Sequence, residues 1–259
     1  MSLGPGDGSY MIPRAVEALR AAEVVVGYKT YIEIIADMLE GKKVFSSGMR
    51  KEVDRCRSAI ESALEGSRVA LVSSGDAGIY GMAGLVFDIC SERGLRVRAA
   101  GGAEGGEGEA SGDFAIEVIP GISAFNAAAS LLGAPLMHDF AAISLSDHLT
   151  PWDLIEKRLL ACASADFVIA LYNPRSKSRP EVLAKARELL LRFRSPETPT
   201  GIVRQAMREG EWKLITTLGE LPFDEVDMQS VVLVGNSRTY AWNGWMATPR
   251  GYLDKYAIG

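Results

Sequence analysis

The stretch that decides the fold is the loop Ser73-Ser74-Gly75-Asp76-Ala77-Gly78-Ile79-Tyr80-Gly81. It follows a short apolar run over 69–72 and precedes apolar residues at helical spacing over 82–92. This order is typical of a buried parallel strand, a loop and a helix, and open α/β sheets bind their ligands at such strand ends. Gly75 and Gly78 permit positive φ angles and a close approach of a ligand to the backbone. The loop is therefore the first candidate binding site.

Asp76 stands between these two glycines, so its carboxylate lies on a loop and not on a solvated helix face. Two roles are open for it, a cap for the following helix or a polar contact to a ligand. The loop lacks the glycine spacings of a phosphate cradle (G-x-x-x-x-G-K-[ST]) and of a dinucleotide site (G-x-G-x-x-G). We therefore expect a ligand that is not held by a phosphate.

Composition narrows the class of protein. The 259 residues are 47% hydrophobic and 24% charged, which is ordinary for one or two globular domains. A net charge of -5 argues against nucleic acid as a partner, since nucleic-acid binding favours a basic surface. No apolar run is long enough for a membrane span, and no signal peptide is recognisable. Three scattered cysteines, two histidines and no C-x-x-C pair predict reduced thiols, no protein-built metal site and a cytoplasmic protein.

Strand and helix patterns alternate along the whole chain. In the first half, strands are predicted at 23–28, 43–45, 69–72, 95–98 and 116–119, and helices at 13–22, 31–39, 51–66 and 82–92. In the second half, strands are predicted at 140–145, 166–171, 200–203, 212–216 and 230–234, and helices at 153–162 and 181–192. This alternation predicts an α/β protein.

A second strand-to-helix junction closes the first half, and Ser123 is expected to cap the helix that follows it. We place the domain boundary after Gly121, which gives an N-terminal domain over 1–121 and a C-terminal domain over 122–259. Within the first domain, the Gly/Ala/Glu-rich run 99–113 is predicted to be a mobile insertion, because it offers little apolar surface to bury. Almost no strand precedes the first glycine-rich loop.

Taken in order, the loops resemble the motifs of the tetrapyrrole methylases, the S-adenosylmethionine-dependent enzymes of cobalamin and sirohaem synthesis. The matching motifs are Gly4-Pro5-Gly6-Asp7, the run 22–28, Ser74-Gly75-Asp76 and Pro120-Gly121-Ile122-Ser123-Ala124. Three further blocks resemble the members that methylate carbon 17 of the macrocycle and contract its ring, namely 144–152, 171–176 and 248–252. A lone Ser-Gly-Asp is a weak signal, whereas the ordered set spans nearly the whole chain.

The resemblance implies two αβα domains with mixed, largely parallel sheets, an active site in the cleft between them, and a homodimer. It implies S-adenosylmethionine as the methyl donor, which leaves S-adenosylhomocysteine as a product. The implied substrate is a precorrin, a tetrapyrrole fringed with carboxylates, either metal-free (precorrin-3B) or carrying cobalt (cobalt-precorrin-3). The implied cofactor-binding set is Pro5, Gly75, Asp76, Ile79, Tyr80, Ser123, Ala124, Tyr172, Asn173 and Gly201, with Gly235 and Asn236 as weaker members.

The implied reaction also requires cations that bind the substrate carboxylates and groups that transfer protons. Loop cations that suit the substrate carboxylates are Arg175, Lys177, Arg179, Arg204 and Arg250, although each can equally be a solvated surface residue. Ring contraction requires proton transfer, for which Asp76, Asp147 and His148 are candidates. Two other functions stay open: a related methylase that acts at another ring carbon, and a non-catalytic nucleotide-binding module.

Overall fold

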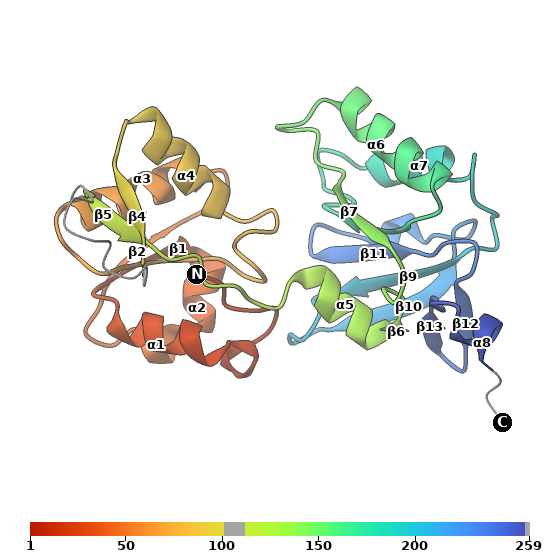
Figure 1. The fold of residues 1–259 in the computed structure, drawn as a ribbon, viewed down its shortest axis with the longest axis horizontal. Helices are drawn as coiled ribbons and strands as arrows, with labels where there is room; N and C mark the ends of the chain where they lie inside the picture. Colours follow the sequence, from red (N-terminus) through yellow and green to blue (C-terminus); the bar gives the residue numbers. More distant parts are fainter. Residues whose placement is uncertain (101–111, 257–259) are drawn as a thin grey trace. The chain divides into compact units, whose positions relative to one another are not determined.

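The computed structural model describes residues 1–100 and 112–256 and divides the chain into two compact units, Met1–Ser123 and Ala124–Gly259 (Figure 1). Each unit contains a β-sheet with helices packed on it, which confirms the predicted α/β class. The insertion predicted at 99–113 falls mostly on 101–111, outside the described residues.

The first unit is built on the parallel sheet β2-β1-β3. Its strands are β1 (Val24–Tyr28), β2 (Lys43–Ser47) and β3 (Val69–Val72), and its helices are α1 (Pro13–Ala21), α2 (Lys29–Ile34), α3 (Glu52–Leu64) and α4 (Ala83–Glu92), with 3₁₀ turns η1 (Gly8–Tyr10) and η2 (Ala36–Met38). Successive side chains of the central strand alternate between the faces, because Val25 packs with α1 and α2 whereas Val24 and Val26 pack with Ala59 of α3. Figure 1 shows α1 and α2 on one side of the sheet and α3 and α4 on the other.

Residues 1–4 extend this sheet beside the end of β3. The Leu3 amide donates to the Ser73 carbonyl at 2.8 Å, and the Ser73 amide donates to the Met1 carbonyl at 3.0 Å. On the other side, the Ser2 amide donates to the Ile119 carbonyl at 3.1 Å. Few residues are therefore enough to form a paired segment here, because backbone partners lie on both sides.

The strand predicted at 116–119 lies elsewhere, which corrects that prediction. β5 covers Phe114–Ile116 and pairs in parallel with β4 (Val97–Ala99). The chain leaves this ladder before Pro120, whose lack of an amide hydrogen makes it a poor continuation of a strand. The Ile119 carbonyl instead accepts hydrogen bonds from the amide and the hydroxyl of Ser2.

The sheet of the second unit has the order β10-β9-β11-β8-β7. Its strands are β7 (Phe140–Ser144), β8 (Val168–Tyr172), β9 (Pro199–Arg204), β10 (Trp212–Thr217) and β11 (Ser230–Val234). Only β7 and β8 pair in parallel, and the other three pairings are antiparallel. The expectation of largely parallel sheets fits the first unit better than this mixed sheet. The short segment 205–211 returns the chain directly into β10, which only an antiparallel pairing allows.

The helices of the second unit cover both faces of its sheet. They are α5 (Ala124–Leu132), α6 (Trp152–Ser164), α7 (Val182–Leu190) and the short α8 (Tyr252–Lys255), with the 3₁₀ turn η3 (Phe223–Glu225). Figure 1 shows α6 and α7 on one side of the sheet and α5 on the other. Leu159 of α6 and Leu183 of α7 are fully buried against Ile169 and Leu171 of β8. None of the helices in the described ranges has the length and apolarity needed to cross a bilayer.

A small second sheet, β12-β13-β6, is absent from the sequence-based prediction. It consists of β6 (Gly133–Ala134), β12 (Tyr240–Trp242) and β13 (Trp245–Ala247). The turn between β12 and β13 is Asn243-Gly244, a strong hairpin signal, and both residues have positive φ angles. The flanking strands are too short to show an alternating pattern of their own.

We expect the thiols to differ in reactivity. Burial raises the pKa of Cys56 to about 11, and Cys90 is also buried with a raised pKa, so neither forms thiolate readily at pH 8. Burial raises the pKa of Cys162 as well, but this thiol is only partly buried, so a reagent can reach it. In the native protein, Ellman's reagent should modify Cys162 alone, and the Cys162→Ser variant should be unreactive. All three thiols should react in denaturant; rapid modification of the native Cys162→Ser variant would contradict the burial of the other two.

Candidate functional site

Two glycines join the first cluster of loops. Gly4 and Gly75 have φ angles of +74° and +65°. The Gly75 amide donates to the Gly4 carbonyl at 2.7 Å, and the Gly4 amide donates to the Gly75 carbonyl at 3.1 Å. A Cβ on Gly4 would lie 2.5 Å from the Tyr10 carbonyl oxygen, and one on Gly121 would lie 2.5 Å from the Gly75 carbonyl oxygen. The close approach of three backbone segments therefore depends on glycine.

Asp76 connects two of these segments through its carboxylate. Oδ1 accepts a hydrogen bond from the Gly78 amide at 2.7 Å, and Oδ2 accepts one from the Gly121 amide at 3.0 Å. Helix α4 begins only at Ala83, so Asp76 does not cap it, and that alternative from the sequence is wrong. The structure therefore places Pro5, Gly75 and Asp76 in one group of loops in the first unit.

Ser2 belongs to the same group, and sequence reasoning missed it. Its buried hydroxyl donates to the Ile119 carbonyl at 2.7 Å and accepts from the Ala77 amide at 2.8 Å. These partners are 117 and 75 positions away in the sequence, so no local pattern could indicate them. Ser2 therefore links the middle of the Asp76 loop, at Ala77, to the segment before Gly121.

Ser123 has a different role from the one expected. Helix α5 begins at Ala124, but the Ser123 hydroxyl has no hydrogen-bond partner among the described residues, although the side chain is buried. The amide of Phe125, which a cap would bind, donates instead to the Tyr172 hydroxyl at 3.1 Å. Ser123 therefore does not cap α5 and keeps a buried polar atom unsatisfied. In the same loop system, Tyr80 is half-exposed with a φ angle of +54°, and Ile79 is partly buried.

A second cluster of predicted residues lies at the carboxyl ends of β7, β8 and β9. The parallel register pairs Ser144 with Tyr172, and the two antiparallel pairings of β11 bring the end of β9, at Arg204, to the same edge. Asn173 follows with a φ angle of +50°, and its Nδ2 donates to the Ser144 hydroxyl oxygen at 2.9 Å. Within this unit, Tyr172 thus contacts the Phe125 amide and Asn173 contacts the Ser144 hydroxyl.

Two of the arginines predicted to bind the substrate already form hydrogen bonds or ion pairs within the protein. Arg175 donates to the Phe223 carbonyl at 2.8 Å and to the Asp224 carboxylate at 3.0 Å. Arg179 is mostly buried, binds the loop after β7 and lies 3.7 Å from the Asp147 carboxylate. Two residues predicted for separate roles are therefore an ion pair in this structure.

The remaining candidates are more open. The Arg204 guanidinium lies 5.4 Å from the centre of the Trp212 ring, in a cation–π contact, and donates to the Glu225 carbonyl at 3.4 Å. Three further candidates are exposed, namely Lys177, Arg250 and His148.

Gly201, Gly235 and Asn236 are not brought to this edge. Gly201 lies within β9, where a Cβ would overlap the side chain of Leu132 in α5, so its evident role is close packing of that helix. Because β11 runs antiparallel to β8, Gly235 lies beside the amino end of β8. At about 3.3 Å per residue, four residues of strand put it roughly 13 Å from Tyr172.

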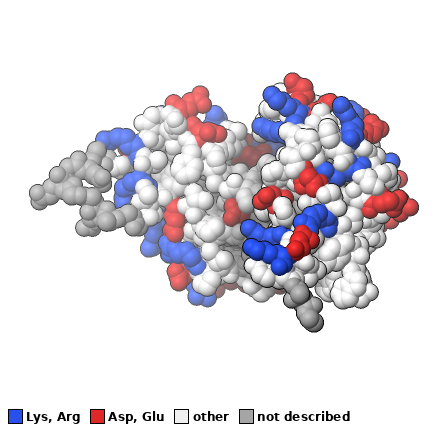
Figure 2. Space-filling view, turned by 45° about the vertical axis from the view of Figure 1, so that its right-hand side comes forward, with Lys and Arg blue, Asp and Glu red and all other residues white. Residues whose placement is uncertain are grey.

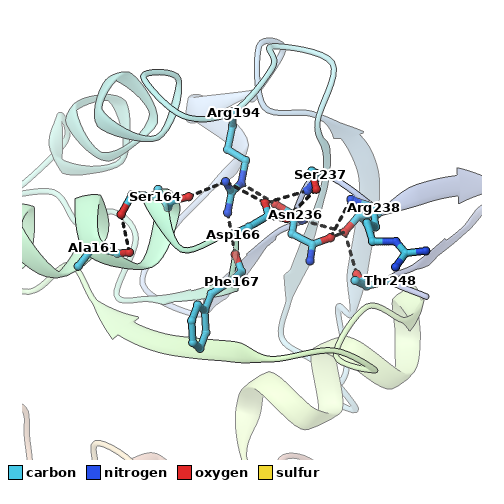
Figure 3. Close-up of polar contacts among 12 residues, drawn as sticks. Ala161, Ser164, Asp166, Phe167, Arg194, Asn236, Ser237, Arg238 and Thr248 are labelled. Carbon is cyan, nitrogen blue, oxygen red and sulfur yellow. Dashed lines mark hydrogen bonds and ion pairs between the residues drawn. The ribbon is translucent and has the colours of Figure 1, made fainter. Parts of the chain in front are cut away.

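The buried Asn236 instead accepts hydrogen bonds at Oδ1 from the Arg238 amide at 3.0 Å and from the Thr239 hydroxyl at 3.2 Å, and the residues on either side of it contact a polar network around Arg194 (Figure 3). The Arg194 guanidinium donates to the main-chain carbonyls of Ala163, Phe167 and Gly235, at 2.6, 3.0 and 3.4 Å, and lies 3.1 Å from the Asp166 carboxylate. Burial lowers the pKa of Arg194, and the neighbouring charge of Asp166 opposes that effect. Asp166 also accepts hydrogen bonds from the amide and hydroxyl of Ser237, at 3.0 and 2.6 Å. The network fixes the loop after β11 at the edge opposite Tyr172.

On the face in view in Figure 2, Lys and Arg side chains are interspersed with Asp and Glu, without a continuous basic stripe. Over 1–100 and 112–256, no group of three or more His, Cys, Asp or Glu residues is arranged to hold a metal ion.

Residues 1–222 match the family described as Tetrapyrrole (Corrin/Porphyrin) Methylases. The chain belongs to this family. The methylase is 51% identical over 252 residues to a Salmonella typhimurium protein named probable cobalt-factor III C(17)-methyltransferase. The aligned residues cover 97% of this chain and 98% of that protein. It is 46% identical to the cobalt-factor III methyltransferase of Priestia megaterium, over all of this chain and 45% of that longer protein. The crystal structure of the methyltransferase CobJ superposes with a TM-score of 0.85 at 37% identity, over 96% of this chain and 97% of that one.

We expect the Asp76→Ala variant to lose about 2–3 kcal/mol of unfolding free energy, because two backbone amides lose a charged acceptor. The control is Asp88→Ala on the exposed face of α4, a carboxylate of the same unit, which should change stability by about 0.5 kcal/mol or less. Urea unfolding followed by circular dichroism measures both. Equal stability of the two variants would show that the Asp76 carboxylate does not fix the loops.

Proposed function

We propose that this methylase transfers a methyl group from S-adenosylmethionine to carbon 17 of a cobalt-bound tetrapyrrole, cobalt-factor III or cobalt-precorrin-3, with ring contraction, in cobalamin biosynthesis. The observation that carries the proposal is 51% identity across nearly the full length of the Salmonella protein of that name. The name of the relative from Priestia megaterium also specifies a cobalt-bearing substrate, which favours cobalt over metal-free precorrin-3B.

The first cluster of loops fits the methyl donor, which supplies an electrophilic methyl group on a sulfonium when bound. Buried hydroxyls usually have partners, so the unsatisfied Ser123 hydroxyl is available for a ligand. Gly75 allows the backbone to approach a ligand closely, and Pro5 and Tyr80 adjoin the same loops. Asp76 acts by holding Gly78 and Gly121 in place, so we assign it a positioning role.

In the second unit, Ala124, Tyr172 and Asn173 are the residues that we assign to the cofactor. The Tyr172 hydroxyl holds the first turn of α5, and Ser144 holds the Asn173 side chain. Methyl transfer from an activated donor depends mainly on alignment of the reactants and exclusion of water, which side chains fixed in this way support. We assign structural roles to Gly201, Gly235 and Asn236, for the packing and network contacts described above.

For the substrate, the proposal favours the exposed cations Lys177 and Arg250 as first contacts for carboxylates. Arg175 and Arg179 would contribute only donors that their protein partners leave free. Of the three groups predicted for proton transfer, Asp76 already accepts two amide hydrogens, so Asp147 and His148 are our candidates. We also propose a cytoplasmic homodimer, as the family resemblance implies.

The Gly75→Val variant should not bind S-adenosylhomocysteine, because valine is strained at a φ angle of +65° and would displace the loop. Gly94→Val is a matched control, since Gly94 has the same φ angle of +65° in the first unit but open space around it. Isothermal titration calorimetry should show binding for wild type and Gly94→Val and none for Gly75→Val. Wild-type affinity in Gly75→Val would show that this loop is not part of the cofactor site.

Turnover tests the reaction itself. The protein is incubated with methyl-labelled S-adenosylmethionine and either the cobalt-bound substrate or its metal-free counterpart. We expect label in the tetrapyrrole with the cobalt-bound substrate, and mass spectrometry with nuclear magnetic resonance should place it at carbon 17. Label at another carbon would indicate a related methylase. Binding of S-adenosylhomocysteine without any turnover would favour the non-catalytic module.

A further inference from the structure

Tyr28 is the last residue of β1, the central strand of the first sheet. In the parallel register it lies beside Ser47 of β2. Continuing the register of β1 with β3 by one residue puts it beside Ser73, where the Asp76 loop starts. Adjacent strands are about 4.8 Å apart, and open α/β sheets bind their ligands at these carboxyl ends. Tyr28 is therefore one strand away from the first cluster of loops.

Arg55 of α3 fixes the surroundings of Tyr28. Only 5% of the Arg55 side chain is exposed, and its guanidinium carbon lies 5.9 Å from the centre of the Tyr28 ring. The guanidinium donates to the Ser47 hydroxyl at 2.9 Å and to the Gly48 carbonyl at 2.7 Å, and it pairs with the Glu52 carboxylate at 3.0 Å. One arginine therefore holds both the carboxyl end of β2 and the Tyr28 ring.

The Tyr28 ring is held, but its hydroxyl is not. Tyr31 of α2 contacts the ring edge-on, with 5.2 Å between the ring centres. No group within 1–100 or 112–256 forms a hydrogen bond with the Tyr28 hydroxyl, and this hydroxyl is not one of the buried polar atoms that lack a partner. It is therefore open to a ligand. A fixed ring that presents a free hydroxyl is a preorganised hydrogen-bond donor.

We propose that the Tyr28 hydroxyl donates a hydrogen bond to a carboxylate of the tetrapyrrole substrate, and that Arg55 is the positioning residue that fixes its ring. The inference rests on the proposed function, which supplies a ligand with several carboxylates. A phenol hydroxyl can donate, and hydrogen bonds to an ionised acceptor are shorter and stronger than those between neutral groups.

S-adenosylmethionine also carries a carboxylate, but the charges around Tyr28 favour the tetrapyrrole. Arg50 lies in the loop after β2, and β2 adjoins β1 on the side opposite β3. Arg50 is exposed and forms no ion pair with any residue in the described part of the chain. Arg55 adds a buried positive charge, which Glu52 partly balances. Two cations near one donor suit a ligand with several carboxylates better than a ligand that itself carries a cationic sulfonium.

The test is Tyr28→Phe, which removes the hydroxyl and keeps the ring that packs with Arg55 and Tyr31. The matched control is Tyr240→Phe, which removes an exposed hydroxyl from β12 in the second unit. Absorbance titration in the presence of S-adenosylhomocysteine measures the dissociation constant of the cobalt-bound tetrapyrrole. Calorimetry measures that of S-adenosylhomocysteine alone, and urea unfolding measures the stability of each variant.

We expect Tyr28→Phe to bind the tetrapyrrole about tenfold more weakly, which is the scale of a hydrogen bond to a charged group, with S-adenosylhomocysteine binding and stability unchanged. Tyr240→Phe should match wild type in all three measurements. Tetrapyrrole binding of wild-type strength in Tyr28→Phe would overturn the proposal. A loss confined to S-adenosylhomocysteine would also overturn it, because the hydroxyl would then bind the cofactor. A wild type that binds S-adenosylhomocysteine but no tetrapyrrole would overturn the proposed substrate, and this inference with it.

The role of Arg55 is tested by Arg55→Lys, which keeps the charge but cannot reach both Ser47 and Gly48. If Arg55 acts through Tyr28, this change weakens tetrapyrrole binding in the wild-type background and adds little to Tyr28→Phe. An equal loss in both backgrounds would overturn the positioning role. If Arg55→Lys does not fold, Ser47→Ala, which removes one partner of Arg55, takes its place.

Discussion

The exchange of hydrogen bonds between Gly4 and Gly75 is the constraint on which the candidate site of the first unit depends. Both residues occupy the left-handed region, where a side chain would be strained. Their contact turns the chain after β3 so that the Asp76 carboxylate reaches the amides of Gly78 and Gly121. Removing one glycine would therefore disturb three backbone segments together, although only one of them carries the substitution.

The second unit holds its candidate residues in another way. There the positions are set by side chains, through the contact of the Tyr172 hydroxyl with α5 and of Asn173 with Ser144. The loops beyond this edge are held by arginine, since Arg175 and Arg179 bind main-chain carbonyls as well as carboxylates.

Sequence reasoning predicted the α/β class and most element positions, because apolar periodicity and glycine-rich strand ends are local properties. It also proposed Gly75 and Asp76 as candidate site residues. For Asp76 it left open a helix cap or a ligand contact, whereas the carboxylate accepts a hydrogen bond from a segment 45 residues away. The partner of Arg175, Asp224, is 49 residues away, so local patterns could not predict this pairing either. The placement of Gly235 depended on the direction of β11, which local patterns do not reveal.

The polar network around Arg194 restricts which residues can replace arginine at this position. Its guanidinium reaches the carbonyls of Ala163, Phe167 and Gly235 and faces Asp166, so several of its fixed donors are in use at once. Lysine carries the same charge, but it offers its donors from a single nitrogen and cannot span carbonyls from three segments. A neutral residue would leave the Asp166 carboxylate without its cation. A substitution of Arg194 is therefore expected to destabilise the second unit and to be removed by selection.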